Sequence, residues 1–428
     1  MEKYKLGEIA TVEISGVDKK IKDGEKKIRL CNFVDVYYNW AITIAQHDSF
    51  MPATARPNEI SKFQLRKGQV ALTKDSETRD DIGISTYIAD DFDDVILGYH
   101  CALITPQRNI LDGSYLNAIL HTKYAKKYFA CNASGSGQRY ALSVEALNSF
   151  PIPKIPLSEQ KQIGEIFSSL DKKIELNRRI NQNLEAMAKQ LYDYWFLQFD
   201  FPDENGRPYK SSGGKMVWNE KLKRDIPISW ETKLIDDVAE IYNGATPSTM
   251  NELNYGGDIV WVTPKDLSDQ KQKFVYKGER NISQVGYDSC STHLLPLNTI
   301  LMSSRAPIGL LAIAKTELCT NQGFKSFVPK SGNTTIYLYY YLQHHIRQIE
   351  QLGTGTTFKE VSREDILKFP MLKPSDNVLD LWEEMVSALN DRQLEIQKEN
   401  ESLTKQRDEL LPLLMNGQVS VNSDLSDD

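Results

Sequence analysis

The sequence predicts an α+β fold with an internal pseudo-two-fold duplication, in which two globular, strand-rich domains are joined by two long helices that form an antiparallel coiled coil. Three observations lead to this prediction. The 428-residue chain repeats itself at an offset of 219 residues. Each copy contains short apolar runs bounded by turn residues, which are typical of strands. Each copy then ends in a stretch with heptad spacing, which is typical of a coiled coil.

The duplication is clearest where each globular part gives way to its helix. At the offset of 219 residues, Leu147 lies over Ile366 and Phe150 over Phe369, and the match continues without a gap into the helices. A period this long excludes a solenoid, whose repeats are about 20–50 residues long. The sequence therefore contains two copies of one module, each a globular part followed by a helix.

The repeat also sets the expected domain boundaries. We expect a first globular domain at residues 1–155, a first helical region at 156–199, a linker and second globular domain at 200–374, a second helical region at 375–418, and an acidic disordered tail at 419–428. Strands are expected at Val70–Thr73, Gly83–Ile88 and Ala102–Thr105, with counterparts at Thr299–Met302, Leu310–Ala314 and Phe324–Val328. Shorter helices are expected at Leu116–Phe129 and Tyr337–Leu352, and Asp200–Trp230, rich in Gly, Pro and Ser, is expected to be a linker.

Two long helices are predicted from apolar and amide residues that recur at alternating intervals of three and four. Their coiled-coil seam comprises Phe167, Leu170, Ile174, Asn177, Asn181, Leu184 and Leu191 in the first helix, and Leu389, Ile396, Asn400, Leu403 and Leu410 in the second. Ser158 and Ser375, each close behind a proline, are the expected start signals. Because buried asparagines set the register of coiled coils, we expect Asn177 opposite Asn400 in an antiparallel pair. The alternative is that each helix only covers its own domain.

Composition and charge exclude several classes of protein. The chain has no run of 18 apolar residues and no basic-then-apolar N-terminus, so we expect no membrane span, no secretory signal and a cytoplasmic location. Its five cysteines are scattered and form no C-x-x-C pair, which argues against a disulfide framework and a structural zinc site. The net charge of −7 comes mostly from the last 58 residues, which hold 5 Lys/Arg and 13 Asp/Glu, so the globular domains are nearly neutral.

No catalytic constellation is recognisable in the sequence. It contains no phosphate-binding G-x-x-x-x-G-K-[ST] loop, no dinucleotide-binding glycine turn and no histidines with metal-ligand spacing. We therefore expect no catalytic residues, no metal site and no cofactor bound by this chain. A duplicated binding protein fits better than an enzyme whose two halves both lack every motif.

Matching loops in the two copies have the composition of nucleic-acid contacts. Gly135–Arg139 and Gly353–Lys359 are rich in hydrogen-bond donors, which can approach phosphate oxygens, and Gln138 and Arg139 of the first loop are side chains that can reach base edges in the major groove. The candidate DNA-binding residues are Lys74, Arg79, Ser136, Gln138, Arg139, Lys265, Arg305, Gln322, Thr356 and Lys359. Each of them is also compatible with an ordinary turn. Two copies that differ most in their loops, however, indicate one scaffold with two specificities.

Several stretches of the sequence together carry a family resemblance. They are the first helix opening Pro156–Ile163, the segment Phe201–Tyr209, the entry to the second copy at Ile226–Trp230, the run Cys319–Phe324 and the ending Leu410–Gly417. With them the chain resembles, over essentially its whole length, the specificity (S) subunit of type I restriction-modification systems. The second helix departs from the family pattern, because Ser375–Val378 lacks the Ser-Glu-Gln opening.

The resemblance implies a non-catalytic subunit with two target-recognition domains, each of which reads one half of a bipartite asymmetric DNA site. It also implies partners: double-stranded DNA, two modification (methyltransferase) subunits docked by the helices, and restriction subunits, but no membrane. The complex is expected to methylate adenine N6 and to have ATP-dependent endonuclease activity, using S-adenosylmethionine, ATP and Mg. Two alternatives remain open. One is the recognition subunit of a methylation-only or phage-exclusion system, and the other is a coiled-coil scaffold that binds proteins.

Overall fold

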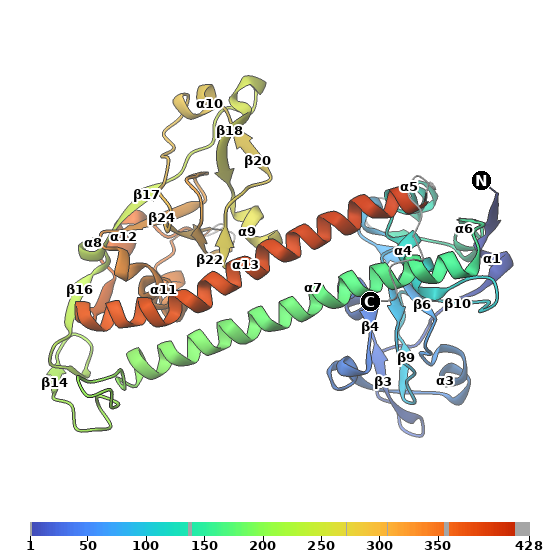
Figure 1. Ribbon diagram of the computed structural model, residues 1–428, viewed down its shortest axis with the longest axis horizontal. Helices are drawn as coiled ribbons and strands as arrows, with labels where there is room; N and C mark the ends of the chain where they lie inside the picture. Colours follow the sequence, from blue (N-terminus) through green and yellow to red (C-terminus); the bar gives the residue numbers. More distant parts are fainter. Residues whose placement is uncertain (1, 136–138, 271, 306, 355–358, 416–428) are drawn as a thin grey trace, which may run out of the picture. The chain divides into compact units, whose positions relative to one another are not determined.

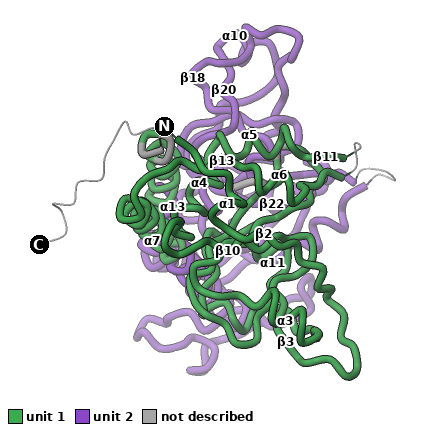
Figure 2. The backbone as a smooth tube through the Cα atoms, turned by 90° about the vertical axis from the view of Figure 1, so that its right-hand side faces the viewer, with its two compact units in different colours: residues 1–177, 399–428 green, residues 178–398 purple. Residues whose placement is uncertain are grey.

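The computed structural model describes residues 2–135, 139–270, 272–305, 307–354 and 359–415. The chain divides into two compact units (Figure 2). Unit 1 comprises residues 1–177 and 399–428, and unit 2 comprises residues 178–398. Each unit holds one globular domain together with a part of each long helix.

The core of unit 1 is built on a five-stranded sheet in the order β2-β10-β6-β8-β4, of which Figure 1 labels β4, β6 and β10. Its strands are β2 (Ala10–Ile14), β4 (Ala41–Ile42), β6 (Val70–Thr73), β8 (Ser85–Ile88) and β10 (Cys101–Pro106). β10 runs antiparallel to both of its neighbours, and the edge strand β4 runs parallel to β8. The three apolar runs predicted as strands in this domain form β6, β8 and β10, of which β6 is buried throughout. Such continuous apolar runs are expected of strands covered on both faces.

Three smaller sheets complete the strands of unit 1. A second sheet has the order β5-β3-β9, with β9 parallel to β3, and a small antiparallel sheet has the order β11-β12-β7. β1 pairs with β13 and so ties the start of the domain to its end. The bounds are β1 (Lys3–Lys5), β3 (Lys26–Cys31), β5 (Met51–Ala55), β7 (Asp75–Ser76), β9 (Val95–Leu97), β11 (Ser134–Gly135), β12 (Tyr140–Ala141) and β13 (Pro151–Pro153).

Short helices cover these sheets, and two of them, α4 and α5, replace the one helix predicted from the sequence. They are α1 (Leu6–Ile9), α2 (Phe33–Tyr38), η1 (Ile44–Ser49), α3 (Pro57–Phe63), η2 (Arg79–Asp81), α4 (Gly113–Leu120), α5 (Lys123–Asn132) and α6 (Val144–Asn148). The single helix expected at Leu116–Phe129 was wrong, because α4 and α5 are separate. The Thr122 side chain accepts a hydrogen bond from the Ala125 N–H and caps a new helix, which is a favoured role of threonine.

Unit 2 repeats the five-stranded sheet, the second sheet and the terminal strand pair of unit 1. Its five-stranded sheet has the order β17-β24-β21-β22-β19, with β24 antiparallel to both neighbours and the edge strand β19 parallel to β22. Its second sheet has the order β20-β18-β23, with β23 parallel to β18, and β16 pairs with β25 as β1 pairs with β13. The duplication expected from the sequence is therefore confirmed at the level of sheet topology.

The elements of unit 2 have the following bounds. The strands are β14 (Met216–Asn219), β15 (Arg224–Pro227), β16 (Glu231–Leu234), β17 (Ala239–Asn243), β18 (Tyr255–Val262), β19 (Phe274–Val275), β20 (Arg280–Ile282), β21 (Ile300–Ser304), β22 (Ile308–Ala314), β23 (Cys319–Thr320), β24 (Phe324–Pro329) and β25 (Pro370–Lys373). The helices are α8 (Ile235–Val238), η4 (Glu252–Asn254), α9 (Pro264–Gln270), α10 (Gln284–Asp288), η5 (Gly332–Thr334), α11 (Thr335–Gln351) and α12 (Arg363–Leu367). The helix expected at Tyr337–Leu352 corresponds to α11.

The segment 200–230 is more than the simple linker expected from its composition. It forms the β14–β15 hairpin, and its aromatic rings join the core at the end of the first long helix. Phe201 stacks on Tyr209 with 4.6 Å between ring centroids and on Trp230 with 5.1 Å. Phe201 and Trp230 are both buried. Their burial removes large apolar surfaces from water, so this segment is part of the folded domain.

Two long helices, α7 (Leu157–Tyr192) and α13 (Asp376–Met415), follow the globular parts, and α7 continues into a π-helical turn, η3 (Asp193–Leu197). In unit 1, Asn177 Nδ2 donates hydrogen bonds to Asn400 Oδ1 (3.0 Å) and Glu399 Oε2 (2.8 Å). The expected contact between Asn177 and Asn400 is therefore present. Ser158 lies inside the first turn of α7 rather than before it, whereas Ser375 directly precedes α13.

The residues predicted as a seam are sheltered from solvent to different degrees. Four are buried: Phe167, Ile174, Asn177 and Ile396. The others are half-buried: Leu170, Asn181, Leu184, Leu191, Leu389, Asn400, Leu403 and Leu410. The acidic tail predicted at 419–428 lies outside the described residues.

In unit 1 the last part of α13 packs on the globular domain through Trp40, which directly precedes β4. The Trp40 ring stacks on the His121 ring with 4.2 Å between centroids, and the Arg407 guanidinium lies 5.1 Å from the Trp40 centroid. Burial lowers the pKa of His121 to about 3, so this ring is neutral near pH 7. Phe167 and Leu410 belong to the same apolar cluster.

In unit 2 the corresponding position, directly before β19, is occupied by Lys273. Its Nζ donates hydrogen bonds to Glu185 Oε2 on α7 (2.9 Å), the Tyr340 hydroxyl on α11 (2.7 Å) and Asn390 Oδ1 on α13 (2.7 Å). Gln393 on α13 donates to the same Glu185 oxygen (3.2 Å). Burial lowers the pKa of Lys273, and the Glu185 carboxylate opposes that shift. One buried ammonium group thus holds three helices and the edge of the sheet together.

Candidate nucleic-acid interface

In unit 1 the small sheet β11-β12-β7 brings two of the predicted loops side by side. β12 pairs with β7 so that Tyr140 lies opposite Ser76 and Ala141 opposite Asp75. Lys74 directly precedes β7 and Arg139 directly precedes β12. The structure therefore brings together candidates that are 65 positions apart in the sequence.

Asp75 lies at the centre of a polar cluster that contains Lys74, His100 and Arg139, here called the Asp75 cluster. Its carboxylate, on a side chain that is only 10% exposed, accepts a hydrogen bond from Lys74 Nζ (2.8 Å) and contacts His100 Nδ1. Arg139 Nη2 lies 3.0 Å from His100 Nε2 and 3.8 Å from the Asp75 carboxylate. Burial acts to raise the pKa of Asp75, but the hydrogen bonds with Lys74 and His100 outweigh it and hold the pKa below its ordinary value. One ionised carboxylate thus orients basic side chains at the end of the sheet.

Arg79, in η2, contacts the small sheet β11-β12-β7 of unit 1. Its guanidinium lies 5.0 Å from the centroid of the Tyr140 ring, a distance at which the ring quadrupole attracts a cation. The neighbouring candidates Ser136 and Gln138 lie outside the described residues.

In unit 2 the equivalent loops meet in the same way but carry different side chains. Glu360 forms backbone bridges to both Arg305 and Thr354, which correspond to the strand pairs of the small sheet in unit 1. The Val361 N–H donates to the Ser304 carbonyl (3.1 Å), as the Leu142 N–H donates to the Lys74 carbonyl in unit 1. Arg305 therefore takes the place of Asp75, so the same position is basic in one unit and acidic in the other.

One ion pair joins these unit 2 loops to the neighbouring strand β24. Lys325 Nζ, on a side chain that is 8% exposed, lies 3.3 Å from Glu360 Oε1. Lys359, next to Glu360, is exposed. The candidate Thr356 lies outside the described residues.

Lys265 and Gln322 occupy neighbouring segments of unit 2. Lys265 is the second residue of α9, and its Nζ pairs with Glu279 at 3.2 Å. Gln322 lies in the turn between β23 and β24 and accepts a hydrogen bond from the Thr246 hydroxyl. The turn touches the start of α9, because a Cβ at Gly323 would lie 2.7 Å from Pro264 Cγ. The Gly323 carbonyl accepts from the Ser304 N–H, which places this turn beside the Arg305 loop.

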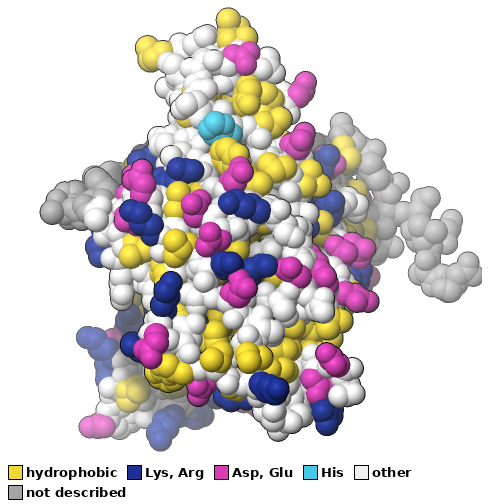
Figure 3. Space-filling model, turned by 90° about the vertical axis from the view of Figure 1, so that its left-hand side faces the viewer, with side chains coloured by type: hydrophobic (Ala, Val, Ile, Leu, Met, Phe, Trp, Pro, Cys, Tyr) yellow, Lys and Arg dark blue, Asp and Glu magenta, His cyan; other side chains and the backbone are white. Residues whose placement is uncertain are grey.

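The surface of unit 2 carries no broad basic region on the face that Figure 3 shows. Basic and acidic side chains are interspersed there, in agreement with the nearly neutral charge of the domain. Because phosphate neutralisation supplies most sequence-independent affinity for DNA, such a surface favours recognition by individual side chains over general attraction.

His100, Lys325 and Glu360 belong to these clusters but were not among the residues singled out in the sequence. Each stands in a segment that is remote from its partners along the chain, so no local motif could reveal it. The buried Lys273 was missed for the same reason, since a lysine beside Gln272 in a polar segment looks solvated. For His100 one signal exists in the structure, because its φ of 70° lies in the left-handed region, which non-glycine residues seldom occupy.

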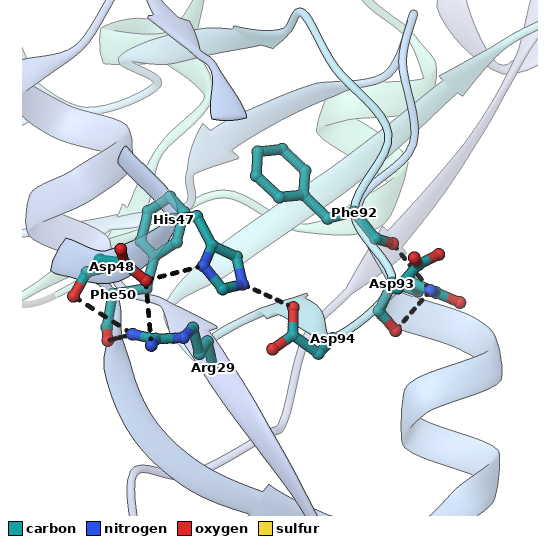
Figure 4. A network of polar contacts seen from close by, with 8 residues as sticks. Arg29, His47, Asp48, Phe50, Phe92, Asp93 and Asp94 are labelled. Atoms are coloured by element: carbon teal, nitrogen blue, oxygen red, sulfur yellow. Dashed lines mark hydrogen bonds and ion pairs between the residues drawn. The ribbon is translucent and has the colours of Figure 1, made fainter. Parts of the chain in front are cut away.

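A further polar network on the second sheet of unit 1 serves the fold (Figure 4). The His47 ring contacts Asp94 Oδ1 (2.9 Å) and Asp48 Oδ1 (3.1 Å), and Arg29 Nη2 lies 3.2 Å from Asp48. The hydrogen bond to Asp94 and then that to Asp48 raise the pKa of His47. These contacts join η1 to β3 and to the start of β9, so we regard them as structural.

Two further features are absent from the part of the chain that the structure describes. None of the helices there is both long and apolar enough to cross a bilayer. No group of three or more His, Cys, Asp or Glu side chains is arranged there to hold a metal ion.

The duplicated topology and its two loop clusters agree with a comparison of sequences. The profile of the type I restriction modification DNA specificity domain matches residues 1–186 and 227–399, one range for each copy, and together more than half of the chain. The chain belongs to this family.

Relatives within the type I specificity family match the chain to different extents. The type I restriction enzyme MjaIX specificity subunit of Methanocaldococcus jannaschii is 37% identical over 197 residues, a match that covers 45% of this chain and 46% of that protein. The type I restriction enzyme HindI specificity subunit of Haemophilus influenzae is 26% identical over 412 residues, covering 84% of this chain and 88% of that protein. The crystal structure of a type I restriction-modification system S subunit from M. genitalium has a TM-score of 0.57 at 14% identity, covering 96% of this chain and 95% of that one. The last match shows that the fold is shared.

Proposed function

We propose that this chain is the DNA sequence-recognition subunit of a type I restriction-modification complex. The first target-recognition domain (residues 1–155) and the second (within residues 200–374) each read one half of a bipartite asymmetric site. The observation that carries the proposal is that two domains with one topology present different charged clusters at the same place, with Asp75 in unit 1 and Arg305 in unit 2. Identical scaffolds with unlike loops are what two unlike half-sites require.

In this proposal the long helices form an antiparallel coiled coil that spaces the two domains. It is supported in unit 1 by the hydrogen bonds between Asn177 and Asn400. It is supported in unit 2 by Asn181 and Gln393, each of which donates from its side-chain amide to the backbone carbonyl of the other (3.4 and 3.3 Å). The contacting residues run in opposite directions along the two helices. Asn181 follows Asn177 in α7, whereas its partner Gln393 precedes Asn400 in α13, as expected of an antiparallel pair.

The chain itself is a non-catalytic component in this scheme. The helices dock two modification subunits, which bind S-adenosylmethionine and methylate adenine N6, and restriction subunits use ATP and Mg to cleave DNA. The complex would act on double-stranded DNA in the cytoplasm. Because both recognition domains are nearly neutral, we expect tight binding only when the modification subunits add their own contacts. Nanomolar, sequence-selective binding by the isolated chain at physiological salt would contradict this part of the proposal.

Strand-resolved mapping of N6-methyladenine tests the function directly. The chain and its modification subunits are expressed in a host without other adenine methylation, and all methylated positions are mapped. We expect one bipartite, asymmetric motif. Exchange of residues 1–155 for the first domain of another family member should then change one half of the motif and leave the other half intact. Absence of a sequence motif, or a change in both halves at once, would refute the proposal. Binding to proteins without any methylation would instead favour the scaffold.

A further inference from the structure

We propose that Arg139 reads a guanine in the half-site of the first target-recognition domain, and that His100 and Asp75 are positioning residues that hold its guanidinium for this contact. The inference rests on the proposed function, since it assigns a base to one half of the proposed site. It is carried by a relay of contacts that runs outward from the Asp75 carboxylate through the His100 imidazole to the Arg139 guanidinium.

The relay begins at a buried carboxylate. Asp75 is only 10% exposed and pairs with Lys74 Nζ at 2.8 Å, so it is held in the ionised form, which can only accept hydrogen bonds. The His100 Nδ1 that contacts it must therefore carry the proton. Arg139 Nη2 lies 2.9 Å from His100 Nδ1 and 3.0 Å from Nε2, so the guanidinium lies against the imidazole at nearly equal distances from both ring nitrogens.

The imidazole in the middle of the relay is itself fixed. His100 has a φ of 70°, and the Lys74 N–H donates to its carbonyl at 2.9 Å. The Tyr99 ring lies against the imidazole, with 4.0 Å between centroids. The imidazole is thus held by its backbone, by a neighbouring ring and by Asp75, and it can transmit the position of the carboxylate to Arg139.

Arg139 is the exposed end of the relay. Its side chain is 61% exposed, and within the described part of the chain it makes hydrogen bonds through Nη2 alone. The remaining N–H donors of the planar fork are left for a ligand. Two parallel donors on a rigid plane match the O6 and N7 acceptors of guanine in the major groove, which is the commonest specific contact of arginine with DNA. Because the fork is already oriented, less side-chain entropy is lost on binding.

The same geometry favours a base over a phosphate as the partner of Arg139. An arginine fork can also pair with a phosphate, but a phosphate can be neutralised without a fixed plane, by exposed lysines such as Lys123 and Lys126. A relay of three side chains that fixes one guanidinium plane is required only where the angle of approach matters. The two possibilities differ in their effect on binding, since loss of a phosphate contact weakens all sequences alike.

The test uses the full chain assembled with its modification subunits. The wild-type motif is first established by methylation mapping. Duplexes that carry each of the four bases at each position of the first half-site are then compared by initial methylation rate. We expect the wild-type complex to prefer guanine at one position by about 5- to 150-fold. Arg139→Ala should reduce this preference to within about 2-fold at that position only, and Arg139→Lys, which keeps the charge but not the fork, should do nearly the same.

Two further variants test the positioning residue His100, and a third variant serves as a matched control. His100→Ala should lower the guanine preference, whereas His100→Asn should retain more of it, because an amide offers one donor and one acceptor and asparagine tolerates positive φ. Arg56→Ala is the control, since the Arg56 side chain is 64% exposed on another sheet of the same domain and should leave every preference unchanged. Thermal unfolding verifies that each variant is folded.

The outcomes separate this inference from the function on which it rests. An unchanged base preference in Arg139→Ala, an equal loss of rate on all duplexes, or a first half-site without a critical guanine would refute the role of Arg139 while the two-domain reading stands. Failure of the wild-type complex to methylate any bipartite motif would overturn the proposed function and the inference with it.

Discussion

Replacement of Lys273 by methionine should destabilise unit 2 strongly, because it removes one partner of a largely buried ion pair. The Lys273 side chain is 9% exposed and lies 2.9 Å from the Glu185 carboxylate, which is 30% exposed. Glu185 Oε1 already has no hydrogen-bond partner among the described residues, so the variant leaves a poorly solvated charge. Breaking a buried pair from one side costs about 3–5 kcal/mol. The partial exposure of Glu185 lowers our expectation to about 2–4 kcal/mol.

A double-mutant cycle with Glu185→Gln separates the ion pair from the loss of packing. Glu185→Gln leaves Lys273 with its bonds to Tyr340 and Asn390, each 2.7 Å long, so we expect a smaller loss of about 1–2 kcal/mol. Lys273→Met combined with Glu185→Gln removes the orphaned charge and should recover part of the stability. The expected coupling energy is about 1–3 kcal/mol.

Calorimetry of the full chain provides the readout, because the unfolding transition of unit 2 can be followed separately if it differs from that of unit 1. Hydrogen exchange at the amides of α11 supplies a second, local measure of the same free energy. A loss of less than about 1 kcal/mol in Lys273→Met, or a coupling energy indistinguishable from zero, would show that the ammonium group does not hold the helices to the sheet.

Three other predictions concern the helices and two buried titratable groups. Asn177→Cys combined with Asn400→Cys should form a disulfide on mild oxidation, seen as a mobility shift that the single variants lack, since the two side chains are in hydrogen-bond contact at 3.0 Å; no crosslink would refute this register. Burial raises the pKa of Glu383 to about 7, so the stabilisation available with a protonated carboxyl at low pH is lost as the pH rises through 7. Glu383→Gln should therefore raise the unfolding temperature at pH 8 and leave it nearly unchanged at pH 4, with a gain of roughly 1 kcal/mol after allowance for solvent screening; equal effects at both pH values would contradict the assignment. Burial lowers the pKa of His121 to about 3. On acidification the unfolded chain therefore binds a proton at this ring before the folded chain does, and the free energy of unfolding falls as the pH drops from about 6.5 towards 3. His121→Gln should reduce that slope by about 1.4 kcal/mol per pH unit in urea titrations between pH 6 and 4; an unaltered slope would mean that the ring is not kept neutral.

Features that depend on regular spacing along the chain could be predicted from the sequence. Contacts between residues far apart in the sequence could not. The offset of 219 residues anticipated the repeated sheet order, and the heptad positions anticipated the contact of Asn177 with Asn400. Both rest on regular spacing, which the chain carries locally. The break between α4 and α5 was missed because apolar spacing runs through it, while one capping hydroxyl, on Thr122, decides it.

The candidate site was only partly accessible for the same reason. Lys74 and Arg139 were selected by type and by their place in loops, but the relay that joins them depends on His100 from a third segment. Its selection requires knowledge that the end of β6 and the starts of β10 and β12 lie close together. Polar residues carry no periodic signal of burial, so Lys273 and Glu360 also gave no sign of their partners.

Trp40 and Lys273 occupy equivalent positions before the edge strands β4 and β19, yet one meets the cation of Arg407 and the other the anion of Glu185. When the first domain is replaced by that of another family member, a different side chain takes the position of Trp40. That side chain then faces Arg407 of α13. An aromatic or acidic residue satisfies the guanidinium there, and a lysine meets a like charge. We therefore expect an exchange of first domains to be tolerated better where the incoming side chain is aromatic or acidic than where it is basic.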